Sequence, residues 1–432
     1  MTLSEIQNKI YEAIDRNSER IISIGKLIQM NPEMGYKEEK TSQIVRNTFD
    51  ELGIQYEHPL ALTGVKAKAK GKESKYNVCI IGELDALKCA AHQLSDKFGT
   101  AHACGHNAQI AAMLGTAMGL VESGVLCELC GDVTFMSAPA EEFIDMEYRS
   151  KLKSEGKIKY YGGKQQLISE GAFDDVDMAM MIHAEPNEPE QKLYVRGHNL
   201  GFIAKNITFL GKAAHGSTPY YGVNALNAAA LAILGIHSNR ETFMDEDRIR
   251  IHPIITRGGD VVNSVPDEVC IDTYVRGATI EAIKKGNDAV NRAVSGAATM
   301  VGASYKIDDI PGYLPIIENE ELSEVFESVA ESFVGRNGLV YGEEITGSTD
   351  IGDLSNIIPV IQPSIGGFSG SLHSSDFSVM DNYTAYILPA KILAGTAAAL
   401  LYGNAENAEN VVSKFNQKLT KEEYINYLNN KK

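Results

Sequence analysis

The sequence predicts an α/β protein with a mainly parallel sheet flanked by helices and a smaller α+β sandwich inserted into it. Apolar, strand-like runs alternate with helical stretches between residues 76 and 186, which is typical of parallel strands covered on both faces. Residues 195–305 instead follow the order strand, helix, two strands, helix, strand, which indicates a small α+β layer. At 432 residues the chain also exceeds one ordinary core. We therefore expect a larger domain from residues 1–194 and 306–432, and an inserted domain over residues 195–305.

The spacing of apolar residues predicts the helices and strands of the larger domain. Two helices are expected before residue 54, the first over residues 3–30 and the second over 37–53, where Gly53 ends it. The remaining elements are strands over 76–87, 132–142 and 177–186, a helix over 108–124, strand-like residues over 356–367 and a last helix over 386–403.

The inserted domain has its own sequence of elements. They are an extended run over 199–216, a helix over 224–239, strands within 249–259 and 267–277, and a helix over 280–302. This order predicts a sandwich of one sheet and two helices.

Charge and composition exclude some classes of function. The net charge of −17 provides no excess of Lys or Arg to neutralise phosphates, so we expect no nucleic-acid partner. We identify no apolar run that would cross a bilayer, and the N-terminal residues lack the pattern of a signal peptide. We therefore expect no membrane partner and a cytoplasmic location.

The six cysteines do not suggest a disulfide framework in a chain of this length. Cys127 and Cys130 have the CxxC spacing of a redox or zinc motif. No second CxxC is present to complete a four-thiolate zinc site. We expect these two cysteines to be ordinary small residues, with a redox role as the weaker alternative.

Polar side chains lie where the predicted strands end. Asp85 ends the first strand, Glu141 and Glu142 end the second, and His183 ends the third. Ligands of open α/β sheets bind outside the carboxyl ends of the strands. Neighbouring residues of an extended strand point in opposite directions, so one glutamate can bind a metal while the other faces a water molecule.

A second group of candidate ligands flanks the helix predicted from residue 108. Cys104 and His106 lie directly before it, and His373 lies in a Gly- and Ser-rich loop far downstream. Together with Glu142 and His183 they offer thiolate, imidazole and carboxylate donors, which suit Zn²⁺ and related divalent ions. Each residue alone could instead be an ordinary core or loop residue, and His102 has a supporting or incidental role.

Seven motifs make the chain resemble a known superfamily. "GELDAL", "HACGHN", "SAPAEE", "HAEP", "AAHGSTP", "VVNSVPDE" and "GSLHSSDF" occur in the order seen in the metal-dependent aminoacylase/carboxypeptidase superfamily. The chain is most similar to its amidohydrolase branch, which includes hippurate, indole-acetyl-amino-acid and p-aminobenzoyl-glutamate hydrolases. The resemblance covers about residues 15 to 400.

The resemblance implies a two-metal hydrolase of amide bonds, with Zn²⁺ or Mn²⁺ as the ions. It implies that the metal ligands are Cys104, His106, Glu142, His183 and His373. Glu141 would be the general base, and Asp85 would orient a ligand. The inserted domain would be a lid through which two subunits join as a homodimer. Within it, His215 would stabilise the oxyanion and Asn263 would contact the substrate.

The chain also departs from its apparent relatives. Asn107 and Gln109 stand where this branch commonly has Asp and His, which puts the hydrogen bonding around the ligands in doubt. "GSTDIGDLSNIIP" resembles the p-aminobenzoyl-glutamate hydrolase and dipeptidase subset. We expect a small-molecule substrate, an N-acyl amino acid or a dipeptide-like amide. The alternatives are a dipeptidase or carboxypeptidase of the same fold, or a non-catalytic protein that binds a small amide.

Overall fold

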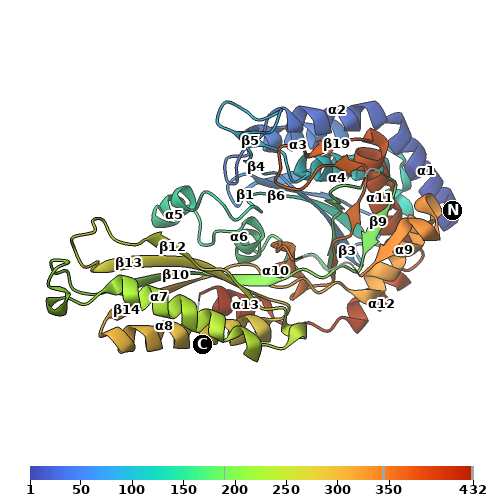
Figure 1. The fold of residues 1–432 in the computed structure, drawn as a ribbon. Helices are drawn as coiled ribbons and strands as arrows, with labels where there is room; N and C mark the ends of the chain where they lie inside the picture. Colours follow the sequence, from blue (N-terminus) through green and yellow to red (C-terminus); the bar gives the residue numbers. More distant parts are fainter. Residues whose placement is uncertain (189, 343–345, 430–432) are drawn as a thin grey trace. The chain divides into compact units, whose positions relative to one another are not determined.

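The computed structural model describes residues 1–188, 190–342 and 346–429, and these form two compact units. The larger unit contains Met1–His198, residues 317–342 and Asp353–Ile425; the smaller contains Asn199–Ile316 with residues 346–352 and 426–429. Figure 1 shows that each unit has its own sheet and helices. Each also has its own hydrophobic core.

The larger unit is built on a six-stranded sheet with the order β1-β2-β6-β3-β7-β16. Its strands are β1 (Tyr56–Leu60), β2 (Gly64–Ala69), β3 (Asn77–Glu83), β6 (Asp132–Ala138), β7 (Met178–Met180) and β16 (Val360–Ile361). Strands β6, β3, β7 and β16 run parallel, and β2 and β1 are antiparallel at one edge. Every residue of β3 and β6 is buried, as expected for parallel strands covered on both faces. The predicted mainly parallel α/β class is confirmed.

Helix α4 (His106–Glu122) is central to this unit. Its residues from His106 to Leu120 are all buried, and it contacts β3, α1, α2 and α11. The other α-helices outside residues 199–316 are α1 (Leu3–Arg16), α2 (Ser18–Gln29), α3 (Glu39–Leu52), α5 (Met146–Ser154), α6 (Gly163–Glu170), α9 (Glu320–Val334), α10 (Ile351–Ser355), α11 (Leu388–Leu401), α12 (Glu406–Lys414) and α13 (Lys421–Leu428).

Short strands complete the larger unit. They are β4 (Leu87–Lys88), β5 (Thr100–Ala101), β8 (His183–Ala184), β9 (Leu193–Val195), β15 (Leu339–Tyr341), β17 (Ser364–Ile365), β18 (Phe368–Ser369) and β19 (Ser378–Val379). Strands β15, β9, β17 and β8 form a small four-stranded sheet, and β4–β5 and β18–β19 form pairs.

The smaller unit is an antiparallel sheet covered by two helices. Its strands are β10 (Gly201–Leu210), β11 (Arg250–Ile251), β12 (Ile254–Arg257), β13 (Glu268–Gly277) and β14 (Ser304–Pro311), in the order β11-β13-β10-β14 with β12 also paired to β13. Helices α7 (Ala225–Ser238) and α8 (Ile280–Val301) lie side by side against this sheet (Figure 1). Apolar side chains of the helices and of β10 and β13 form the core between them.

Some predicted elements are shorter than expected. The helix predicted over residues 3–30 is two helices, because the chain turns at Asn17, whose side chain donates to the carbonyl of Ala13 (3.0 Å). The run predicted as one strand over 177–186 is divided into β7 and β8. The strand predicted to reach residue 142 ends at Ala138.

One helical segment, Tyr383–Leu401, is long and apolar enough to cross a membrane by length and composition, with a mean hydropathy of 1.5. This finding corrects the expectation that no apolar run of the chain is long enough to cross a bilayer. The apolar part of this segment is completely buried inside the protein, and α11 contacts α4, α1 and α9. A helix that is apolar on every side and enclosed by other helices is the core helix of a globular unit.

Candidate metal centre

The loop before α4 brings Cys104 close to His183. Gly105 caps α4 in the left-handed conformation (φ 84°), and a Cβ atom there would lie 2.5 Å from Ala184 Cβ. Only glycine therefore allows the loop to approach β8 this closely. The result is a distance of 3.5 Å between Cys104 Sγ and His183 Nε2.

Glu141 and Glu142 lie in a turn, residues 139–142, that we call the acid turn. Ala140 is left-handed (φ 53°), so the two acids do not continue an extended strand as the sequence predicted. The N–H of Ala140 donates to Glu38 Oε1 (2.8 Å), and its carbonyl accepts from the N–H of Gly163 (3.1 Å). These bonds hold the strained turn in place.

A buried arginine stabilises the same turn from the other side. The Arg149 guanidinium, 1% exposed, donates to the carbonyls of Ala140, Tyr161 and Glu142. Both turn acids are buried, at 8% exposed for Glu141 and 7% for Glu142.

The structure brings the five predicted ligands into one cluster. Two sets of three donor atoms, each within 4.8 Å of one another, share the Cys104 thiol: Cys104, His106 and His183 form one set, and Cys104, Glu142 and His373 form the other. His373 Nε2 lies 3.1 Å from Glu142 Oε1, and its ring is 54% exposed. Two sets that share a thiol fit a pair of divalent ions.

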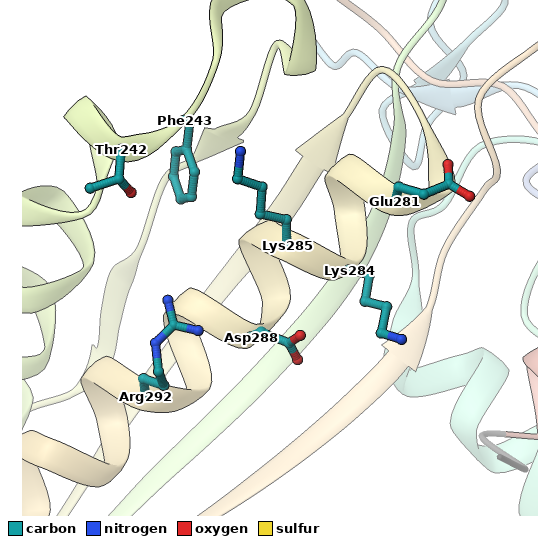
Figure 2. Close-up of a pocket in the computed structure, with 7 residues that line it drawn as sticks. All are labelled: Thr242, Phe243, Glu281, Lys284, Lys285, Asp288 and Arg292. Carbon is teal, nitrogen blue, oxygen red and sulfur yellow. The ribbon is translucent and has the colours of Figure 1, made fainter.

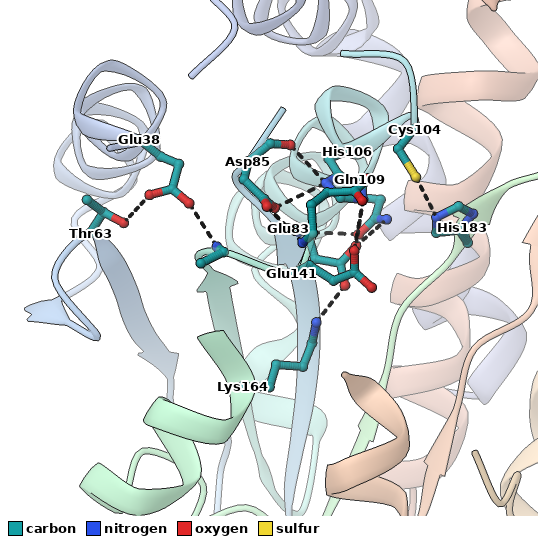
Figure 3. Close-up of polar contacts among 12 residues, drawn as sticks. Glu38, Thr63, Glu83, Asp85, Cys104, His106, Gln109, Glu141, Lys164 and His183 are labelled. Atoms are coloured by element: carbon teal, nitrogen blue, oxygen red, sulfur yellow. Dashed lines mark hydrogen bonds and ion pairs between the residues drawn. The ribbon is translucent and has the colours of Figure 1, made fainter. Parts of the chain in front are cut away.

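Asp85 and Glu83 flank the His106 ring (Figure 3). His106 Nδ1 lies 2.8 Å from the carbonyl oxygen of Asp85, which can only accept, so Nδ1 carries the proton and Nε2 is the ligating atom. Asp85 Oδ2 accepts the N–H of Glu142 (3.0 Å) and so joins the loop of β3 to the acid turn.

The charge states of the cluster also fit a metal. Burial lowers the pKa of His183, so its ring stays neutral and able to ligate. Burial and the Glu142 carboxylate raise the pKa of the Cys104 thiol, so its thiolate form needs a nearby cation. Burial opposes the charged form of His106, but Cys104 and Glu83 outweigh it and raise the pKa of His106, so a metal ion that binds Nε2 would have to displace a proton from it.

His102 has a different environment. It is 2% exposed, and neither ring nitrogen has a hydrogen-bond partner among the described residues. Burial and the charge of His106 lower the pKa of His102 to about 3, so the ring is neutral. It belongs to neither set of donors, in line with the incidental role that we expected.

Sequence reasoning missed a buried network around Glu83. Lys164 Nζ donates to Glu83 Oε1 (2.5 Å), and Gln109 Nε2 donates to Glu83 Oε2 (2.8 Å). Glu83, His106 and Glu141 form a third set of possible metal donors. The available signal was the position of Glu83 at the end of an apolar strand, two residues before Asp85.

Both unusual positions, Asn107 and Gln109, lie in the first turn of α4 and have partners. Gln109 binds Glu83, whereas Asn107 Nδ2 donates to the carbonyl of Gly25 and the hydroxyl of Tyr386, both at 3.2 Å. Asn107 thus fastens α4 to its helical neighbours and does not enter the cluster.

His215 and Asn263 lie in neighbouring loops of the smaller unit. The N–H of Gly216 donates to the carbonyl of Asn263 (2.7 Å), and His215 pairs with Ser264 in an isolated bridge. Both side chains are exposed, and His215 Nδ1 lies 2.7 Å from Ser217 Oγ.

The two residues of the CxxC sequence differ in environment. Cys127 is exposed and Cys130 is buried, and all six cysteines are free. Cys127 Sγ donates to the carbonyl of Gly124. This arrangement favours the ordinary structural interpretation.

The smaller unit also has a shallow hollow of about 330 Å³ beside α8 (Figure 2). Its charged lining is mixed in sign and exposed, with Lys284, Lys285 and Arg292 next to Glu281 and Asp288. Lys285 is already paired with Asp247 (2.7 Å). With three bases and two acids in its lining, the hollow has no strong charge of one sign to select a ligand.

A parallel α/β unit with thiolate, imidazole and carboxylate donors beyond its strand ends has the fold and site of a metal-dependent hydrolase. The chain belongs to peptidase family M20/M25/M40, whose model matches residues 79–397. It is therefore an enzyme of the amidohydrolase and peptidase type.

Curated relatives cover nearly the whole chain. It is 24% identical to "IAA-amino acid hydrolase ILR1-like 2" of Arabidopsis thaliana, over 96% of this chain and 93% of the relative. It is 26% identical to the Xaa-Arg dipeptidase of Mus musculus, over 98% and 95%.

Solved structures share the fold. A dinuclear metal-binding peptidase of Bacillus subtilis, the YXEP protein, superposes with a TM-score of 0.71 at 24% identity, covering 90% of this chain and 99% of that one. The aminobenzoyl-glutamate utilization protein of Klebsiella pneumoniae superposes with a TM-score of 0.65 at 18% identity, covering 90% and 97%.

Proposed function

We propose that the enzyme hydrolyses the amide bond that joins an acyl or aminobenzoyl group to an amino acid. Family membership supports amide-bond hydrolysis as the reaction class. The names of one relative and one structural neighbour refer to conjugates of this kind, an IAA-amino acid and aminobenzoyl-glutamate.

The proposed cofactors are two divalent ions, Zn²⁺ or Mn²⁺. Cys104 would contact both, His106 and His183 would bind one, and Glu142 and His373 would bind the other. Such ions supply Lewis acidity, which polarises an amide carbonyl and lowers the pKa of water.

Glu141 is the proposed general base, and its position is the observation that carries the mechanism. It is buried beside the donors, with Oε2 4.0 Å from His106 Nε2, yet it is not one of the five predicted ligands. Its carboxylate can take a proton from water while the water oxygen bonds to the amide carbon. It can then give that proton to the nitrogen as the C–N bond breaks. The products are a carboxylate and a free amine.

Residues of the smaller unit are proposed to act on the substrate. The His215 imidazole would donate a hydrogen bond to the developing oxyanion, and Asn263 would contact the substrate. Asp85 would act through His106 and the acid turn, because its carbonyl fixes the ring and its carboxylate accepts from Glu142.

The smaller unit is also proposed to be a lid that joins two subunits. Strand β12 supports this proposal, because all four of its residues are exposed and Ile254 and Ile255 are 52% and 43% exposed. Exposed apolar edge strands are usually covered by a partner. The cytoplasmic location stays a prediction.

The test of the mechanism is Glu141→Gln, which keeps the size of the side chain and removes the base. We expect kcat to fall by about 10³-fold or more, with metal content and melting temperature close to wild type. Glu318→Gln, the same change at a glutamate that belongs to none of the donor sets, is the control. Turnover close to wild type in the Glu141 variant would refute the assigned base.

A dipeptidase or carboxypeptidase is the second candidate function, because the Xaa-Arg dipeptidase is as similar to this chain as the amino acid conjugate hydrolases. A panel of N-acetyl, N-benzoyl and N-aminobenzoyl amino acids, assayed beside dipeptides, separates the two. The metal-stripped enzyme should be loaded with Zn²⁺ and Mn²⁺ separately. A higher kcat/KM for dipeptides would favour the second function.

A further inference from the structure

The Glu83 carboxylate lies against the ligating face of His106. Glu83 Oε2 is 3.1 Å from His106 Nε2, and both side chains are 1% exposed. Nε2 nevertheless makes no hydrogen bond to any residue in the described parts of the chain. With the proton on Nδ1, Nε2 and the ionised Glu83 oxygen both present lone pairs at this distance, so the two atoms repel each other unless a cation lies between them.

This geometry is what two ligands of one ion show. Two donor atoms that share a metal ion lie about 3 Å apart when each is about 2.1 Å from it, and the ion offsets the repulsion between their lone pairs.

The opposite side of the cluster repeats the arrangement. His373 Nε2 is also 3.1 Å from a carboxylate oxygen, Glu142 Oε1, and that oxygen has no hydrogen-bond partner among the described residues. Glu142 and His373 are two of the residues proposed as ligands of one ion. The pair of Glu83 and His106 therefore has the same distance between nitrogen and oxygen as the proposed ligand pair.

We propose that Glu83 is a further metal ligand, which binds the same ion as His106. This inference rests on the proposed metal-dependent function and adds one residue to its donors. Glu83 is one of the three side chains in the third donor set, with His106 and Glu141.

Two side chains hold Glu83 ready for this role. Lys164, whose side chain is fully buried, binds Oε1, and Gln109 Nε2 donates to Oε2. A carboxylate offers about four lone pairs, so Oε2 can accept from Gln109 and still bind an ion.

The experiment measures metal binding and not only activity. Metal-stripped wild type, Glu83→Gln and Lys164→Met are titrated with Zn²⁺ against a competing chelating dye, and bound zinc is counted after gel filtration. Glu318→Gln and Lys66→Met are the matched controls. Glu318 accepts the N–H of Gln362 (2.9 Å), and the Lys66 side chain is 9% exposed and paired with Asp175.

If Glu83 is a ligand, Glu83→Gln binds one of two zinc ions at least about 10-fold more weakly. Lys164→Met keeps both ions, because the carboxylate is still present. It also gains more thermal stability from added zinc than wild type does, since the ion replaces the lost positive charge. Both controls bind two ions with wild-type affinity.

Two results would overturn the inference. Glu83→Gln could bind both ions with wild-type affinity, in which case Glu83 is not a ligand. Alternatively, Glu83→Gln and Lys164→Met could lose the same ion to the same extent, in which case the ion pair only positions His106. Wild type that binds no zinc would instead refute the proposed function, so the two failures are distinguishable.

Discussion

Among the described residues, each unit of this enzyme buries one lysine side chain completely, and the two lysines have different surroundings. Lys205 of the smaller unit binds Asp309 and lies 2.6 Å from Asn287 Oδ1, and Asp309 is 26% exposed. Lys164 of the larger unit binds Glu83, which is as buried as the lysine itself.

The difference lies in the charges beyond each pair. One acid partners Lys205, and water reaches that acid. Glu83 lies in a buried group with Asp85, Glu141 and Glu142, and Lys164 and Arg149 provide two positive charges against these four carboxylates. Buried charges are costly unless they are paired. We therefore expect the larger unit, but not the smaller one, to depend on added cations.

Removal of metal is the strongest test of this difference. Chelation should abolish turnover and destabilise the larger unit, by about 4 kcal/mol relative to enzyme with metal at 1,000 times its Kd. Hydrogen exchange measured with and without chelator would locate the effect. We expect protection to fall in α4 and the acid turn and to stay unchanged in β10 and β13. Equal loss in both units would contradict the comparison.

Arg149→Met should have the next largest effect. Arg149 donates to three carbonyls. Those of Ala140 and Glu142 keep a second donor, the N–H groups of Gly163 and Ile144, so the main cost of losing Arg149, about 1–3 kcal/mol, falls on the carbonyl of Tyr161. Because the acid turn would shift, we expect kcat to fall about 10- to 100-fold with a smaller change in KM.

Arg149→Lys is the control for charge alone. A lysine cannot span three carbonyls with a planar fork, so it should restore little of the kcat. Full recovery by lysine would mean that Arg149 contributes charge and not the position of the turn.

The sequence predicts site residues most reliably where they lie next to a run of apolar residues that forms a buried strand or helix. Asp85, His106 and His183 lie next to buried strands or a buried helix, and the resemblance predicted the group of five that the structure brings together. Their roles stay predictions. The two-layer smaller unit also followed from its order of elements, because each strand and helix there has a clear period.

Other features depend on contacts that no local pattern encodes. Ala140 adopts a left-handed conformation because Glu38, Arg149 and Gly163 bind it from distant positions. Lys164 lies in a segment that has no strong period, so nothing in the sequence indicated that it would be buried against Glu83. Nor did the helical period of residues 3–30 reveal the break at Asn17.

Asp309→Asn tests the smaller unit on its own. The variant removes the negative partner of a buried lysine, and we expect a loss of about 2–4 kcal/mol in the free energy of unfolding, less than for a fully buried pair because Asp309 is partly exposed. Urea unfolding measures the loss, and zinc counting should still find wild-type metal content.

Lys205→Met combined with Asp309→Leu should recover most of the stability, since it removes both charges. Loss of zinc in the single variant would contradict the separation of the two units.

Glu38 is a buried acid that keeps its proton and needs no positive partner, unlike Glu83 and Asp309. Its substitution should change stability least. It is fully buried, and burial and the Asp85 charge raise the pKa of Glu38 to about 8. The folded protein therefore keeps a proton that the unfolded chain, with an ordinary pKa near 4.5, has released. Stability should fall as pH rises from 4.5 to 8, by up to about 1.4 kcal/mol per pH unit. Glu38→Gln stays neutral and can still accept the N–H of Ala140, so it removes this slope.

Urea unfolding of wild type and Glu38→Gln at pH 5.5 and pH 8 measures the difference, with the same saturating zinc in every sample. The variant should gain stability relative to wild type at pH 8 and gain less at pH 5.5. If the two proteins instead lose stability in parallel between these pH values, Glu38 is ionised in the folded state. The larger unit would then hold one more buried negative charge, and its dependence on cations would be greater than the comparison with the smaller unit indicates.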